Sequence, residues 1–162
     1  EGSARRGHEW CRVMPAARVL SFVVPGKPVG KGRPRFARIG NGVKTYTPAG
    51  TKSYEHAVTL LARAGLGRLG PLQGPLEVRI EALCPVPSSW SRVKRRRAIE
   101  AQMRPTTKPD IDNLAKAVLD ALNGTAWRDD AQVVELACSK RYGAIPSVHV
   151  VVREIIQEDE HA

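Results

Sequence analysis

The alternation of side chains between Leu76 and Cys84 constrains the fold more than any other feature of this sequence. Apolar or small residues at every second position are separated by Glu77, Arg79 and Glu81. Successive side chains of a strand point to opposite faces, so this pattern predicts a strand with one buried face and one solvent-facing face. The chain is therefore expected to contain a sheet that packs on one side against other elements.

Helical periodicity predicts the elements that pack on this sheet. After Thr51, a plausible helix cap, apolar residues recur at helical spacing until Gly65 and Gly67 end the segment. A second helix is expected from about Asn113 to Asn123, closed by Gly124. Its apolar stripe, which must pack on the sheet, consists of Leu114, Ala117, Val118, Ala121 and Leu122. A basic segment, Trp90 to Met103, is also expected to be helical.

Four further segments favour extended structure or loops. Strands are expected at residues 19–24, 43–47, 132–141 and 147–156, whereas glycine and proline punctuate residues 27–38 and predict a loop or irregular edge. The turn between the last two strands contains Gly143 and Pro146 and predicts an antiparallel hairpin. The expected fold is a small single-domain α/β (α+β) structure, a mixed sheet packed with helices. It should span residues 18–156, between a disordered leader (1–17) and an acidic tail (157–162).

Composition limits the classes of protein to which the chain can belong. Its 162 residues fit one compact domain. It contains no apolar run of membrane-spanning length, so no membrane partner is expected. The three cysteines form no Cys-x-x-Cys pair, which argues against a disulfide framework or structural zinc and fits a reducing cytoplasm. A formal net charge of +10 suggests an anionic partner, although the charge alone also fits a merely soluble basic protein.

Carboxylates gather at both ends of the second predicted helix. Asp110 and Asp112 lie at its start, Lys116 follows one turn later, and Asp129 and Asp130 come after its end. The chain reverses after the helix, so we expect Asp130 to return towards Asp110 and Asp112 by strand pairing. Converging aspartates suit Mg²⁺, with Mn²⁺ as a substitute, because both prefer oxygen ligands. Such an ion polarises a phosphoryl oxygen, and Lys116 could neutralise the developing charge.

Each of these residues also has a simpler interpretation. Asp112 is a good helix N-cap and forms an ordinary i, i+4 pair with Lys116. Asp129 and Asp130 could be a polar turn, and spacing alone does not separate their roles. Asp120 is expected to be solvated or to pair with Lys116. The joint pattern of aspartates and lysine around one helix nevertheless favours a metal site.

Basic residues near the acidic pattern are candidates for contact with DNA phosphates. Arginine and lysine in a glycine-containing loop can bind phosphates without reading sequence. The candidates are Lys27, Lys31, Arg33, Arg35, Arg38 and Lys108. A mobile, solvated loop is the alternative. The run Arg92 to Arg97 is either a solvated helix face or a further DNA contact.

Several segments together resemble the RusA family of Holliday-junction resolvases of bacteria and their phages. They are Lys31-Gly-Arg33-Pro-Arg35, Tyr46-Thr-Pro48, the run from Lys108 to Leu122, and Trp127-Arg-Asp129-Asp130-Ala-Gln-Val133. The resemblance implies that Asp110, Asp112 and Asp130 bind a divalent metal and that Lys116 assists, with a lesser role for Asp129. It also implies a small mixed α/β domain that forms a homodimer.

The function implied by the resemblance is Mg²⁺-dependent cleavage of four-way DNA junctions by paired symmetric cuts. This activity needs no nucleotide cofactor, and a cytoplasmic site in a bacterium is expected, with a bacterial or phage gene. Three other functions fit parts of the pattern. They are an inactive junction-binding module, a metal-dependent enzyme acting on small nucleotides, and a less specific structure-selective nuclease, which is the closest rival.

Overall fold

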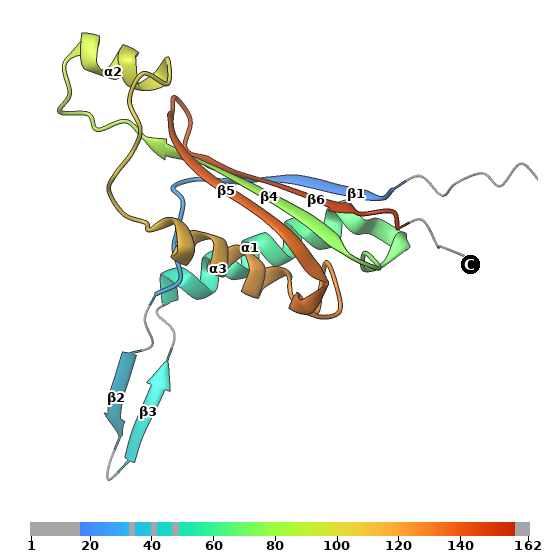
Figure 1. Cartoon of the computed structure of the whole chain (residues 1–162). Coiled ribbons are helices and arrows are strands. Elements are labelled where there is room, and N and C mark those ends of the chain that lie inside the picture. The colour runs from blue at the N-terminus through green and yellow to red at the C-terminus, as the bar shows by residue number, and fades with distance from the viewer. Residues whose placement is uncertain (1–16, 33–34, 40–41, 47–48, 158–162) are drawn as a thin grey trace, which may run out of the picture.

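The computed structural model describes residues 17–32, 35–39, 42–46 and 49–157; side chains are described outside residues 33–48. Its centre is a four-stranded sheet in the order β1-β6-β4-β5 (Figure 1). The strands are β1 (Val19–Pro25), β4 (Leu76–Pro85), β5 (Val133–Gly143) and β6 (Ser147–Glu154). β4 pairs in parallel with β5, and the other pairs are antiparallel. The predicted mixed sheet is therefore confirmed.

Two helices cover one face of this sheet, α1 (Ala49–Leu66) and α3 (Ile111–Leu122), as Figure 1 shows. The alternation in β4 is confirmed, because Leu76, Val78 and Ile80 are buried in the core shared with both helices. The stripe of α3 is also buried, including Leu114 and Leu122. Burying each large apolar side chain stabilises the fold by about 1.5–3 kcal/mol, which explains why α3 lies flat on the sheet.

The third helix, α2 (Arg92–Ile99), lies at one end of the sheet. It is attached through a small cluster in which Ala98 and Tyr142 are buried and Trp90 meets the Tyr142 ring edge-on, with centroids 5.3 Å apart. Two short 3₁₀ turns, η1 (Gly67–Leu69) and η2 (Asp130–Gln132), complete the main domain. Within the described residues, none of the helices is long and apolar enough to cross a membrane.

The predicted hairpin between the last two strands is wrong. β4 lies between β5 and β6, and it pairs in parallel with the first and antiparallel with the second. The physical reason is burial: β5 is exposed at most of its positions and takes the edge of the sheet, whereas the buried side chains of β4 favour an interior position beside β6. Turn residues determine where the chain reverses, but they do not determine which strands become adjacent.

A separate two-stranded ribbon follows the first strand. It consists of β2 (Arg35–Ile39) and β3 (Gly42–Tyr46), paired antiparallel. Residues 27–38, expected to be a loop or an irregular edge, end instead in the regular strand β2, while β3 agrees closely with the expected strand at 43–47. The expected leader and tail lie outside the described residues apart from residues 17 and 157.

Candidate functional site

The start of α3 presents two carboxylates to solvent. The helix begins at Ile111, so Asp110 occupies the N-cap position and Asp112 lies inside the first turn. The prediction of Asp112 as N-cap is therefore wrong, and the Asp110 side chain does not cap the helix either. Both residues are exposed at the end of the helix where the backbone dipole favours negative charge. Their carboxylate oxygens are available for a ligand.

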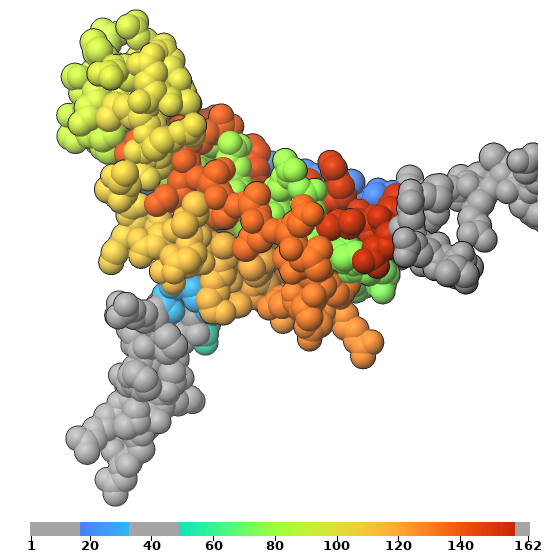
Figure 2. Space-filling model, in the orientation of Figure 1, coloured from blue at the N-terminus to red at the C-terminus, as the bar shows by residue number. Residues whose placement is uncertain are grey.

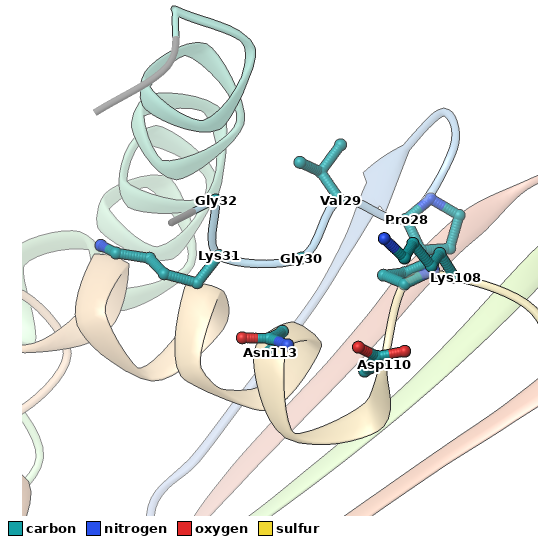
Figure 3. Close-up of a pocket in the computed structure, with 9 residues that line it drawn as sticks. Pro28, Val29, Gly30, Lys31, Gly32, Lys108, Asp110 and Asn113 are labelled. Carbon is teal, nitrogen blue, oxygen red and sulfur yellow. The ribbon is translucent and has the colours of Figure 1, made fainter. Parts of the chain in front are cut away.

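A cleft opens beside Asp110, between the start of α3 and the loop that follows β1. It is lined by Pro28 to Gly32, Lys108, Pro109, Asp110 and Asn113 (Figure 3). The loop lies tightly on the helix, because the Lys31 amide donates a hydrogen bond of 2.7 Å to the Asn113 carbonyl. A Cβ on Gly30 would lie 3.0 Å from Cβ of Pro109 and 3.2 Å from Cβ of Asn113. Glycine at this position therefore permits the contact that shapes the cleft.

The middle of β5 fixes the segment that leads into α3. Lys140 Nζ donates hydrogen bonds to the carbonyls of Pro109 (2.8 Å) and Thr107 (3.0 Å). The Cys138 thiol lies 3.8 Å from the Ile111 carbonyl, and burial raises the pKa of this thiol. Sequence reasoning missed the positioning role of Lys140. The alternation of side chains along β5 could have indicated this role, because it places Lys140 on the same face as Cys138.

Lys31, a predicted phosphate ligand, is engaged in ion pairs. Its Nζ lies 2.6 Å from Glu55 Oε1 and 2.8 Å from Asp120 Oδ2, so it links the loop to α1 and α3. Burial alone would lower the pKa of Lys31, but hydrogen bonds to the two carboxylates raise it. Figure 3 shows the side chain directed away from Asp110.

Lys116 belongs to the same network. Its Nζ lies 3.3 Å from Asp120 Oδ1, which confirms the expected pairing of Asp120 with Lys116. Burial would raise the pKa of Asp120, but hydrogen bonds from Lys31 and Lys116 lower it. The Lys116 side chain is 64% exposed, so its ammonium can leave this pair at little cost.

Asp130 lies at the opposite end of α3. The helix has 12 residues, so its two ends are about 18 Å apart at 1.5 Å per residue. Asp130 starts η2, where the indole N–H of the buried Trp127 donates to its Oδ1 over 3.0 Å. Asp129 instead caps η2, accepting a 2.8 Å hydrogen bond from the Ala131 amide. The two neighbouring aspartates, equivalent by spacing, thus have different surroundings.

The expectation that strand pairing returns Asp130 to Asp110 is wrong for a single chain. β5 begins at the far end of α3, and only its middle, at Cys138 and Lys140, reaches the helix start. In the described part of the chain, no group of three or more His, Cys, Asp or Glu residues is arranged to hold a metal ion. One chain therefore places Asp110 and Asp112 at one end of α3 and Asp130 at the other.

The remaining cationic candidates fall into three groups. Lys27 and Lys108 are exposed and line a neighbouring hollow with Trp90 and Tyr142. Arg33 lies outside the described residues, as do the side chains of Arg35 and Arg38. In α2 the whole run from Arg92 to Arg97 is exposed, and Lys94 Nζ stands 4.1 Å from the centre of the Trp90 ring.

The protein has a mixed sheet with helices on one face, exposed carboxylates at the start of a helix and a net charge of +10. These features define a class of small basic α+β proteins suited to binding a polyanion. The chain belongs to the endodeoxyribonuclease RusA family, whose profile matches residues 25–153. It is also 38% identical over 138 residues to the uncharacterized protein YqaN of Bacillus subtilis (strain 168). That match covers 84% of this chain and 96% of YqaN. The resemblance inferred from the motifs is confirmed, and the family supports nuclease activity.

Proposed function

We propose that the protein is a Mg²⁺-dependent endodeoxyribonuclease that resolves four-way DNA junctions by paired symmetric cuts. The observation that carries this proposal is the pair of free carboxylates, Asp110 and Asp112, at the exposed start of α3 in a member of this nuclease family. Helix capping, the alternative explanation for these two carboxylates, accounts for neither side chain. A bacterial cytoplasm is the proposed setting, with the gene of bacterial or phage origin.

Asp110 and Asp112 are the proposed ligands of the metal ion. The donor set fits, since Mg²⁺ commonly takes one or two protein carboxylates and keeps its other positions for water and phosphate. When bound, the ion would polarise the scissile phosphate and supply a hydroxide nucleophile. Lys108 is exposed beside Asp110, where its ammonium is placed to hold a DNA phosphate.

Lys116 has a separate proposed role. Its ammonium can leave Asp120, because exposed ion pairs contribute only about 0–1 kcal/mol. Once free, it can reach over the first turn of α3 and neutralise negative charge that develops on the phosphate in the transition state. Lys31 is assigned no role in binding DNA, because its charge is already balanced by Glu55 and Asp120.

A homodimer is the proposed active form. A four-way junction has near two-fold symmetry, and a dimer with two-fold symmetry provides two identical sites for the two opposed cuts. The strong positive charge of the chain favours a long polyanion over a free nucleotide as substrate.

The substitution Asp110→Asn tests the metal site directly. It removes a ligand charge but keeps the shape of the side chain, so we expect normal binding to a synthetic junction and a loss of cleavage of at least about a hundredfold. The matched control is Asp129→Asn, which affects the cap of η2 and should reduce cleavage far less than Asp110→Asn does. Gel-shift and strand-nicking assays on the same junction separate the two effects. Nicking at the normal rate by the Asp110→Asn variant would contradict the proposal.

A further inference from the structure

A second space, the side hollow, adjoins the cleft at the start of α3. It has a volume of about 340 Å³, and Pro28, Lys108 and Pro109 line both the hollow and the cleft. Figure 3 shows Pro28 and Lys108 next to each other, beside Asp110. The two spaces therefore lie side by side, and a DNA strand with a phosphate at Asp110 has its neighbouring nucleotide within reach of the side hollow. In Figure 2 the surface between α2 and α3 is not covered by other described parts of the chain.

The walls of the side hollow are flat and largely apolar. Four prolines line it, together with the rings of Trp90 and Tyr142. Two exposed lysines, Lys27 and Lys108, add positive charge. Aromatic rings beside cations are the combination that binds single-stranded nucleic acid, because every base has a face that can stack and every phosphate carries a negative charge. The side hollow therefore has the chemistry of a nucleobase site.

Hydrogen bonds and ring contacts hold these walls in place without a ligand. Lys140 Nζ donates to the carbonyls of Thr107 (3.0 Å) and Pro109 (2.8 Å), and both of these residues line the hollow. On the opposite wall, the ring of Trp90 meets the buried Tyr142 edge-on. A site that is already in shape loses little conformational freedom when a ligand binds.

The indole of Trp90 still offers a surface to a ligand. Trp90 is partly exposed and lines the hollow. The Lys94 ammonium stands 4.1 Å from the centre of its ring, but Lys94 is not among the residues that line the hollow. This cation therefore holds the ring from outside and leaves the part that faces the hollow free to stack.

The size of the side hollow limits what can enter it. Its volume lies at the lower end of the range of about 300–1,000 Å³ for small-molecule sites, so it has room for a single base but not for a base pair. A base must therefore leave its pair to enter. That step costs least where pairing or stacking is already incomplete. Base pairs at the branch point of an open four-way junction border an open centre, so they open more readily than pairs within a duplex.

We propose that the side hollow binds one unpaired base of the DNA strand to be cut, next to the phosphate at Asp110. The base stacks on Trp90, and Lys27 binds a neighbouring phosphate. This inference rests on the proposed function and deepens it, because it states how the site distinguishes branched DNA from duplex. A continuous duplex can fill the side hollow only by opening an intact, fully stacked pair.

Photocrosslinking of the wild-type protein tests the position of the base. Once the cut phosphate of a synthetic junction has been mapped, 5-iodouracil replaces a base on either side of it, and a third junction carries the analogue in the middle of an arm. The complexes are formed without Mg²⁺ and irradiated, and the crosslinked residue is identified by mass spectrometry. We expect a crosslink to Trp90 or Tyr142 from one flanking position and none to these residues from the arm. The absence of this crosslink from both flanking positions would overturn the proposal.

The substitution Trp90→Leu tests the contribution of stacking. It keeps an apolar side chain but removes the aromatic face, so we expect about tenfold weaker binding of the junction and unchanged binding of a linear duplex. Trp90→Phe retains a stacking face and should recover most of the affinity for the junction. The matched control is Val93→Ala, because Val93 is exposed on α2 and does not line the hollow. It should leave both affinities unchanged.

The outcomes separate this inference from the proposed function. Mg²⁺-dependent junction cleavage and junction affinity that are both unaffected by Trp90→Leu would overturn the base site and leave the nuclease function standing. An equal loss of affinity for junction and duplex would also overturn it, since Trp90 would then contribute to the fold alone. A wild-type protein that cuts no junction in the presence of Mg²⁺ would instead contradict the proposed function.

Discussion

Two lysines line the same cleft but have different surroundings. Lys31 is half-buried between Glu55 and Asp120, while Lys108 is exposed. Both belong to the basic pattern of the sequence, and charge alone assigns both to DNA. The structure gives Lys31 the role of holding the loop, α1 and α3 together, and leaves Lys108 available for a phosphate.

The substitution Lys31→Met should lower the free energy of unfolding by about 1–2 kcal/mol, between the values for exposed and buried ion pairs. Glu55 and Asp120 then lose the cation between them. Because the folded pKa of Asp120 lies below its unfolded value, its stabilising contribution is present above the unfolded pKa and is lost as pH falls through the folded pKa. Urea denaturation at neutral and acidic pH should show a smaller acid dependence in the variant.

Lys108→Met is the control for that experiment. It should leave stability unchanged and reduce the salt slope of DNA binding by about 0.9. Equal stability of the two variants would contradict the structural role of Lys31.

At the scale of elements, the periodicity of apolar residues correctly predicted which faces of the strands and helices are buried. The alternation from Leu76 to Cys84 and the stripe of α3 were sufficient, since each side chain's face follows from its spacing. The position of β4 between β5 and β6 was not predictable in this way, because adjacency depends on which strands bury both edges. The same error explains the misplaced return of Asp130: sequence reasoning assumed that the start of β5, rather than its middle, meets Asp110.

The cleft is shaped by the contact between α3 and the loop that follows β1. Gly30→Val should destabilise the fold by about 1–3 kcal/mol and reduce cleavage, because its side chain collides with Pro109 and Asn113. Gly50→Ala, in α1, has open space around the added Cβ and should be neutral or stabilising by up to about 1 kcal/mol. Thermal melting and junction nicking check both. Unchanged melting and nicking in the Gly30→Val variant would show that the close approach is unimportant.

The whole molecule combines a sheet, the helices α1 and α3 on one face of that sheet, and the cationic helix α2 at one end of it. The helix α2, whose arginines are exposed, lies at the same end of the sheet as the start of α3, while the start of β5 lies at the other end (Figure 1). The candidate site residues could be predicted from the sequence motifs and from the distribution of charged residues. Their arrangement could not, because spacing alone did not show that Asp130 lies at the opposite end of α3 from Asp110 and Asp112.

The most direct measurement compares the cleavage of a synthetic four-way junction with that of a linear duplex of the same sequence, with Mg²⁺ and with a chelator. The proposed function predicts paired, opposed nicks in the junction that require Mg²⁺, and no detectable cut in the duplex. Equal cleavage of the two substrates would favour a less specific nuclease, and unchanged cleavage in the chelator would contradict a site built on Asp110 and Asp112.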